Sequence, residues 1–241
     1  MKIKYPQLLT MKKIAPRTSL LIALSLVLGF VGCATAPSLP EVTEDGLARV
    51  KDAQADALYL RPGAQLAVYT KVSLLEPRIA FRAGWQTDTG RSSLGKRVSD
   101  KDMQAMIDTG KKLLIEEFTA ELTKGGYTVV TESGPDVLVV KAAITDLDVL
   151  APDPTNLAGA WTKTYSDGAG EATLMVELFD SVTGQVLVRA VDHKSDSHGG
   201  GFSWRIPRSR FTNINDARSA LGSWAEMLVK GLDRAKSAKK S

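Results

Sequence analysis

The sequence predicts an α+β fold, with an antiparallel sheet of about five strands and two helices packed on one face of it. Residues 99–124 and 214–235 repeat apolar side chains every three or four positions, which is the period of an amphipathic helix. Residues 137–149, 171–179 and 185–193 alternate apolar and polar side chains, which is the period of a strand. The predicted order along the chain is β-α-β-β-β-β-α.

Upstream of the first long helix, the pattern predicts one strand and little else that is regular. Residues 65–75 alternate in the manner of a strand, and Pro77 ends it. Residues 78–98 contain three glycines and a single tryptophan, Trp85, so we expect an irregular loop there. A short helix is expected over 46–59.

Local signals mark the ends of the predicted helices. Ser99 is a good first cap, because its hydroxyl can accept a hydrogen bond from the backbone of Asp102. Two consecutive glycines from Gly125 end that helix, and a short strand follows at 127–131. Asn213 is expected to cap the last helix.

Three segments between the strands and the last helix are expected to be loops. Residues 150–170 are rich in proline, glycine and asparagine and contain Trp161. Residues 180–184 form the hairpin turn between two strands. Residues 194–211 include three consecutive glycines.

The first 32 residues have the composition of a signal peptide. The apolar run 20–31 is about a dozen residues long, which is too short to cross a bilayer but typical of a signal peptide's apolar segment. Five basic residues and no acidic ones lie within residues 1–32. Translation can begin at Met1 or at Met11, and the sequence leaves this open.

Cys33 is the only cysteine of the chain and directly follows this leader. The residues from Phe30 to Cys33 resemble the bacterial lipobox, whose cysteine is acylated and becomes the new N-terminus; Phe30 departs from its usual leucine. The alternative is an ordinary signal peptide with an incidental cysteine. Acyl chains on Cys33 would bind membrane lipid, because each buried methylene adds about 0.8 kcal/mol. The residue after Cys33 is Ala34. An aspartate at this position is associated with retention in the inner membrane, and its absence resembles the pattern of lipoproteins sorted to the outer membrane.

The expected organisation is a signal peptide (1–32), a lipidated N-terminus and tether (33–64), and a single α+β periplasmic domain (65–241). Removing the leader takes away five of the 31 basic residues and none of the 27 acidic ones, so the remaining chain has a net charge of −1. A chain without excess positive charge does not favour nucleic acid as a partner.

Several short motifs in a fixed order resemble the bacterial lipoprotein family known as domain of unknown function 3313. The resemblance covers roughly residues 45–235. It implies an envelope-localised α+β domain and supplies no established activity, cofactor or catalytic residue, so only the role of Cys33 is carried over. The motifs are Phe30–Cys33, Gly125–Tyr127, Gly134–Asp136, Ala143–Asp146, Glu177–Ser181, Thr183–Gly184, Val191–Asp192 and Trp224–Ala225.

The segment 192–198 holds both histidines of the chain and is the best candidate for a metal site in the sequence. His193, His198 and Asp196 are the candidate metal ligands, but their spacing matches no recognised ligand motif. Asp192 and His193 should point to opposite sides of a strand end. We therefore favour a solvated loop, and we expect no metal, cofactor or catalytic residue.

The leading hypothesis is a lipid-anchored, non-catalytic module that binds or assembles with another envelope protein or a glycan. The alternative is an envelope hydrolase or metal-dependent enzyme that uses the 192–198 loop and the 150–170 segment. The position of the His193, Trp85 and Trp161 segments separates the two: convergence on a concave pocket with carboxylates would favour an enzyme.

Overall fold

The computed structural model describes residues 39–51, 53–92, 98–150, 164–166, 168–197, 206–208 and 210–238. All of them belong to one compact unit that begins at Leu39. Its elements, in chain order, are β1 (Ala48–Arg49), β2 (Ala57–Leu60), the 3-10 helix η1 (Leu66–Val68), β3 (Lys71–Leu74), β4 (Arg78–Phe81), α1 (Trp85–Ser92), α2 (Asp100–Lys124), β5 (Thr128–Val129), β6 (Val137–Val149), β7 (Thr164–Ser166), β8 (Gly168–Asp180), β9 (Val186–Ser197), β10 (Ile206–Arg208) and α3 (Arg210–Ala238).

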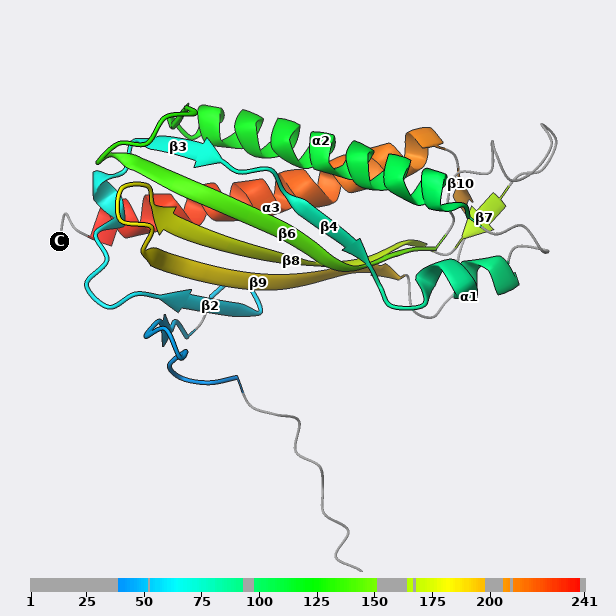
Figure 1. Ribbon diagram of the computed structural model, residues 1–241, viewed down its shortest axis with the longest axis horizontal. Coiled ribbons are helices and arrows are strands. Elements are labelled where there is room, and N and C mark those ends of the chain that lie inside the picture. The colour runs from blue at the N-terminus through cyan, green and yellow to red at the C-terminus, as the bar shows by residue number, and fades with distance from the viewer. Residues whose placement is uncertain are drawn as a thin grey trace, which may run out of the picture. The chain divides into compact units, whose positions relative to one another are not determined.

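The main sheet is mixed and has eight strands in the described residues (Figure 1). Its order is β1-β2-β9-β8-β6-β3-β5, and β4 pairs with β6 farther along the edge that β3 occupies. The pairs β3–β5, β3–β6 and β4–β6 are parallel, and the other pairs are antiparallel. β7 and β10 form a separate two-stranded sheet.

The α+β class and the mostly antiparallel character of the sheet are therefore confirmed, whereas the predicted number of about five strands is wrong and three of the strand pairs are parallel. β5 corresponds to the short strand expected at 127–131. The missed strands of this sheet are β1, β2 and β4, which have two to four residues each. A segment that short cannot show enough alternation to be recognised, and its pairing is decided by its neighbours in the sheet.

Three local expectations need the same correction. The predicted strand 65–75 is the 3-10 helix η1 followed by the shorter β3. The predicted irregular loop 78–98 contains β4 and α1. The short helix expected at 46–59 is instead the strands β1 and β2, which join the sheet through β9. These two strands lie within residues 33–64, where we expected the tether.

The long helix α2 begins as predicted. The Ser99 hydroxyl accepts a hydrogen bond from the backbone N–H of Asp102 at 3.2 Å, and the Asp102 carboxylate accepts one from the backbone N–H of Ser99 at 3.3 Å. This reciprocal box satisfies two of the backbone donors that a helix start leaves free. The helix ends before Gly126, whose positive φ of 83° suits glycine. The last helix, α3, begins at Arg210, three residues before the expected cap at Asn213.

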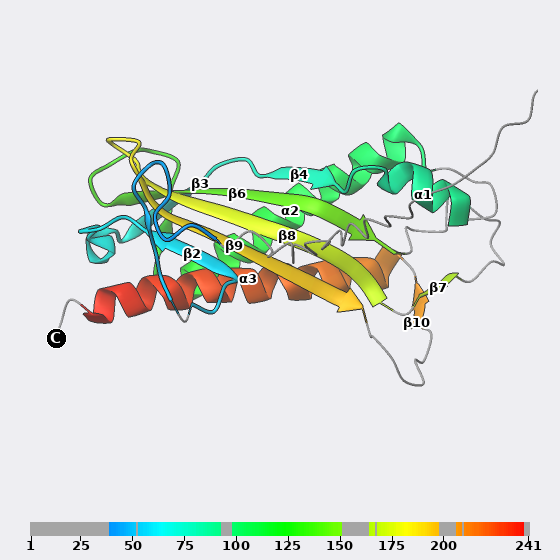
Figure 2. The same ribbon diagram turned by 90° about the horizontal axis from the view of Figure 1, so that it is seen from below.

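Both long helices cover one face of the sheet. Phe118 and Leu122 of α2 and Trp224 of α3 are almost fully buried in the core cluster that also includes Leu138 and Val140 of β6. In the view of Figure 2, α3 runs alongside β9. The helices are parallel, because residues 116 and 117 of α2 form ion pairs with residue 218 of α3, while Val229 contacts the α2 end at Gly125.

A second, smaller core lies next to β2. Leu47, Ala57 and Tyr59 are buried together, with Val186 and Val191 of β9 packed against them. The segment that precedes β1 is tied in as well, because the Asp45 carboxylate pairs with Arg189 at 2.9 Å. The folded unit thus includes the residues from Leu39 onward rather than starting at residue 65.

Candidate functional site

The residues singled out in the 192–198 segment separate in the structure. His193 lies in β9 with a side chain that is 45% exposed; its Nδ1 is 3.2 Å from the Thr173 hydroxyl, and its Nε2 is 3.8 Å from the Glu171 carboxylate. Asp196 also belongs to β9, but its side chain is not described. Cys33, His198 and Trp161 lie outside the described residues.

Asp192 points the other way from His193, as expected, but it lies within β9 rather than at the end of the strand. Its carboxylate is nearly buried on the helix side of the sheet. It accepts a hydrogen bond from the indole N–H of Trp224 at 2.8 Å and one from the backbone N–H of Asp56 at 3.3 Å. A buried carboxylate costs free energy unless it is hydrogen-bonded, and these two donors meet that need while joining α3 and the start of β2 to β9.

Within the described part of the chain, no three His, Cys, Asp or Glu side chains come close enough together to hold a metal ion. In the same residues, no helix has the length and apolar character needed to cross a membrane.

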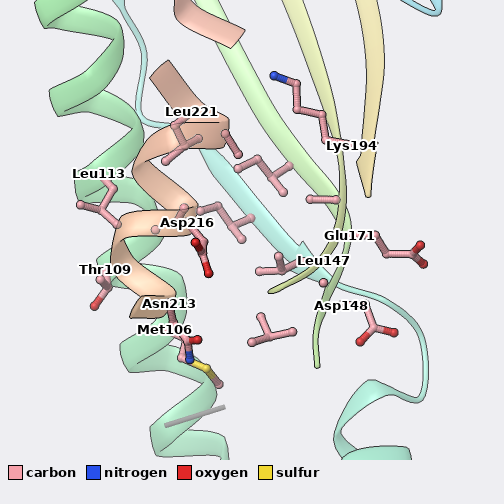
Figure 3. Close-up of a pocket in the computed structure, with 18 of the residues that line it drawn as sticks. Met106, Thr109, Leu113, Leu147, Asp148, Glu171, Lys194, Asn213, Asp216 and Leu221 are labelled. Atoms are coloured by element: carbon pink, nitrogen blue, oxygen red, sulfur yellow. The ribbon is translucent and has the colours of Figure 1, made fainter. Parts of the chain in front are cut away.

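A cavity of about 930 Å³ lies between the two long helices and the sheet (Figure 3). Its walls are the N-terminal halves of α2 and α3 and the adjoining parts of β6, β8 and β9. It is lined by Ile79, Val98, Asp102, Ala105, Met106, Thr109, Gly110, Leu113, Ile144, Leu147, Asp148, Val149, Gly170, Glu171, Ala172, His193, Lys194, Ser195, Asn213, Ile214, Asp216, Ala217, Ser219, Ala220, Leu221, Ser223 and Trp224.

The cavity exists because the facing side chains are small. The α2 wall includes Ala105, and the α3 wall includes Ala217 and Ala220, whereas Ile79 packs closely against Gly110 of α2. Farther along the same helices, large side chains such as Phe118 fill the space. The helices therefore meet through large side chains at one end of their contact and leave a void at the other.

Two irregular backbone positions shape the sheet wall. Asp146 of β6 has a φ of +54° and Gly170 of β8 a φ of +133°, at the shift of register between these strands. A Cβ on Gly170 would lie 1.8 Å from the carbonyl oxygen of Asp148, so only glycine fits there. The bulge also changes the alternation of β6, because Leu147 now packs on the helix side. Bulges are common where a sheet forms the wall of a site.

The charged groups of the cavity lie in different parts of it. Asp148 forms an ion pair with Arg82 at 2.7 Å. The Lys194 ammonium donates a hydrogen bond to the Ser223 hydroxyl at 2.5 Å and lies 5.1 Å from the centre of the Trp224 ring. Burial lowers the pKa of Lys194, while the nearby charge of Asp192 acts to raise it.

Trp85, which we expected in a loop, does not line the cavity. It is 1% exposed, stacks on Phe81 at 4.3 Å between ring centroids, and donates its indole N–H to the backbone oxygen of Val149 at 3.2 Å. Sequence reasoning also missed Lys194 as a site residue. Its neighbours in the chain gave no signal, since Ser223 and Trp224 are some thirty positions away.

Solved structures similar to this chain are distant. A PelC dodecamer from Paraburkholderia phytofirmans is 14% identical, with 71% of this chain and 95% of that chain covered and a TM-score of 0.34. A presumed lipoprotein from Caulobacter crescentus CB15 is 12% identical (73% and 96% covered, TM-score 0.32). A DUF330 protein from Xanthomonas campestris is 11% identical (74% and 93% covered, TM-score 0.33). Similarity this low supports no inference about function.

No curated protein matches the sequence significantly. The profile of one protein family, by contrast, matches residues 41–228, which span nearly all of the described unit. The chain therefore belongs to the family described as "Protein of unknown function (DUF3313)".

Proposed function

We propose that this chain is a lipid-anchored protein of the bacterial envelope whose folded unit binds an apolar ligand in the cavity between α2, α3 and the sheet, without catalysing a reaction. The observation that carries the proposal is the cavity itself. Its volume of about 930 Å³ and its mainly apolar walls match those of small-molecule sites, which typically have about 300–1,000 Å³ and a few polar groups.

The anchoring part of the proposal rests on the leader and on Cys33. Acyl chains on Cys33 would hold the protein at a membrane, and Ala34 favours the outer membrane with the domain facing the periplasm. Because the folded unit begins at Leu39, the five residues between it and Cys33 can separate it from the acylated residue by at most about 20 Å. The folded unit would then lie near the membrane surface rather than on a long tether.

Cys33→Ser tests the anchor directly. In cells labelled with radioactive palmitate, the wild-type chain should incorporate label and be processed, whereas the variant should stay an unlabelled precursor. Continued labelling of the variant would show that the cysteine is not the acylation site.

A neutral fluorescent probe, N-phenyl-1-naphthylamine, tests the cavity. The wild-type protein should bind the probe, and Ala217→Phe, which places a large ring in the α3 wall, should weaken binding at least tenfold. Ala120→Phe is the matched control, because Ala120 is an exposed residue of α2 outside the cavity. Thermal unfolding of each variant shows whether it is folded, and Ala105→Phe repeats the test from the α2 wall. Equal binding by all four proteins would exclude the cavity as the site.

One observation favours a second candidate, an enzyme. His193 belongs to β9, part of the sheet wall, and on the face away from the helices its imidazole Nε2 lies 3.8 Å from the carboxylate of Glu171; such a pair could serve general acid–base chemistry. Purified protein that hydrolyses a chromogenic ester or phosphate, and loses that activity in His193→Ala, would favour the enzyme. We also propose an envelope protein or a glycan as the larger partner, and crosslinking in intact cells would identify it.

A further inference from the structure

We propose that the ligand of the cavity is a single-chain amphiphile with an anionic head group, and that Lys194 binds that head group. The proposal rests on the proposed function, since it specifies the chemistry of the ligand that the cavity accepts. Three features support it: the length of the cavity, the position of Lys194 at one end, and the local neutralisation of the carboxylates.

The cavity is long in the direction of the helices. On α2 its lining extends from Asp102 to Leu113, and on α3 from Asn213 to Trp224. Eleven residues of helix rise by about 16 Å, so both walls extend over that length. Figure 3 shows Met106, Thr109 and Leu113 in succession along α2. A slot of this length with apolar walls suits an extended hydrocarbon chain, for which each additional buried methylene strengthens binding about fourfold.

Lys194 supplies a cation at the Trp224 end of this slot. Its ammonium has three N–H donors, and one of them is used by the Ser223 hydroxyl. Among the described residues, no carboxylate lies within ion-pair distance of it. Partial burial removes part of the water around the Lys194 ammonium, and the same burial lowers its pKa. An anion bound at this position would supply the hydrogen-bond acceptors that the lost water no longer provides.

The Asp192 carboxylate favours the charged form of Lys194 from a distance. It raises the pKa of Lys194, against the effect of burial. Its own oxygens are occupied by the N–H groups of Trp224 and Asp56, so it does not take the place of a ligand's head group. The Lys194 ammonium thus has donors beyond the one used by Ser223 for an anionic partner.

The acidic residues of the cavity do not oppose this arrangement. Asp148 is paired with Arg82, and Glu171 faces His193. In Figure 3 both carboxylates point away from the ammonium of Lys194. Asp102 is used in capping α2, and Asp216 lies seven residues before Ser223, about two helical turns away. An anionic head group bound at Lys194 therefore meets no unpaired carboxylate at that end of the cavity. The apolar chain of the ligand would extend past the other acidic residues.

Three twelve-carbon amphiphiles that differ only in the head group test the proposal: dodecanoate, dodecanol and dodecyltrimethylammonium. Each is titrated, below its micelle concentration, against wild-type protein loaded with N-phenyl-1-naphthylamine. We expect dodecanoate to displace the probe at concentrations at least tenfold lower than dodecanol, and the cation to be the weakest. Lys194→Gln should abolish the preference for dodecanoate and leave dodecanol unchanged, whereas Lys194→Arg should keep the preference.

Lys230→Gln is the matched control, because Lys230 lies on α3 outside the cavity and pairs with Glu226. It should behave as the wild-type protein. If the wild-type protein prefers the alcohol or the cation, or if Lys194→Gln keeps the preference for the acid, the assignment of an anionic head group is overturned while probe binding still supports the cavity. If neither the probe nor any amphiphile binds, both proposals fail.

Discussion

The hydrogen bond between Asp192 and Trp224 is the contact whose loss we expect to destabilise the fold most specifically. It joins the sheet to α3 at 2.8 Å in a site where Trp224 is 3% and Asp192 9% exposed. Trp224→Phe keeps an aromatic ring but removes the N–H, and Asp192→Ala removes the acceptor. A hydrogen bond to a charged group contributes roughly 1.5–3 kcal/mol, and a buried partner left unpaired adds to the loss.

The double-mutant cycle isolates that contribution. Urea unfolding of the wild-type protein, the two single variants and the double variant should give a coupling free energy of about 1.5–3 kcal/mol. For a chain of this length, 1 kcal/mol corresponds to about 2–4 °C in the melting temperature, so each single variant should melt several degrees lower. Asp192→Asn is the control, because it keeps an acceptor and should lose less than Asp192→Ala. Additive losses in the two single variants would show that the contact contributes no stability of its own.

Two further predictions concern the backbone and pH. Gly170→Ala should destabilise the protein by about 2 kcal/mol or more, because the added Cβ has no space. Gly231→Ala, in an open and exposed position of α3, should stabilise it by up to about 1 kcal/mol. Chemical denaturation measures both changes in the free energy of unfolding, and changes of the same sign would contradict the reasoning. Hydrogen bonds from the backbone N–H of Thr183 and from the Tyr69 hydroxyl hold the pKa of Asp180 below its usual value. Because its folded pKa is lowered, Asp180 stabilises the protein above about pH 4 and this contribution is lost as the pH falls through the folded pKa, so Asp180→Asn should be less stable at pH 7 and approach the wild-type protein in acid. A stability difference that does not change between pH 7 and pH 3 would refute the assignment.

The parts of the fold that could be predicted are those whose signal lies within a few neighbouring residues. The cap at Ser99 is confirmed because the partner atoms are three positions apart. The long elements α2, β6 and β8 each extend over enough turns or alternations for their period to be clear. The short strand β4 could not be predicted, since it acquires its strand conformation only by pairing in parallel with β6, more than sixty positions away.

The cavity could not be predicted from the sequence for a related reason. A small residue such as Ala217 is common in any helix, and it leaves a void only because the facing α2 wall also has small residues and the sheet is bulged at Gly170. From the sequence alone, a lysine in a strand is expected to be a solvated charge. Only the structure shows that Lys194 contacts Trp224 and Ser223 of α3.

By itself, the sequence determined the α+β class, the two long helices with their apolar faces and the family, and it predicted a signal peptide that ends before Cys33. These are local properties, because helix and strand periods, caps and a signal peptide are read from neighbouring residues. Only the tertiary structure decided the mixed strand order, the burial of Asp192 against Trp224, and the cavity between α2 and α3. Each of these depends on groups far apart in the chain, which come together when apolar burial packs the helices on the sheet.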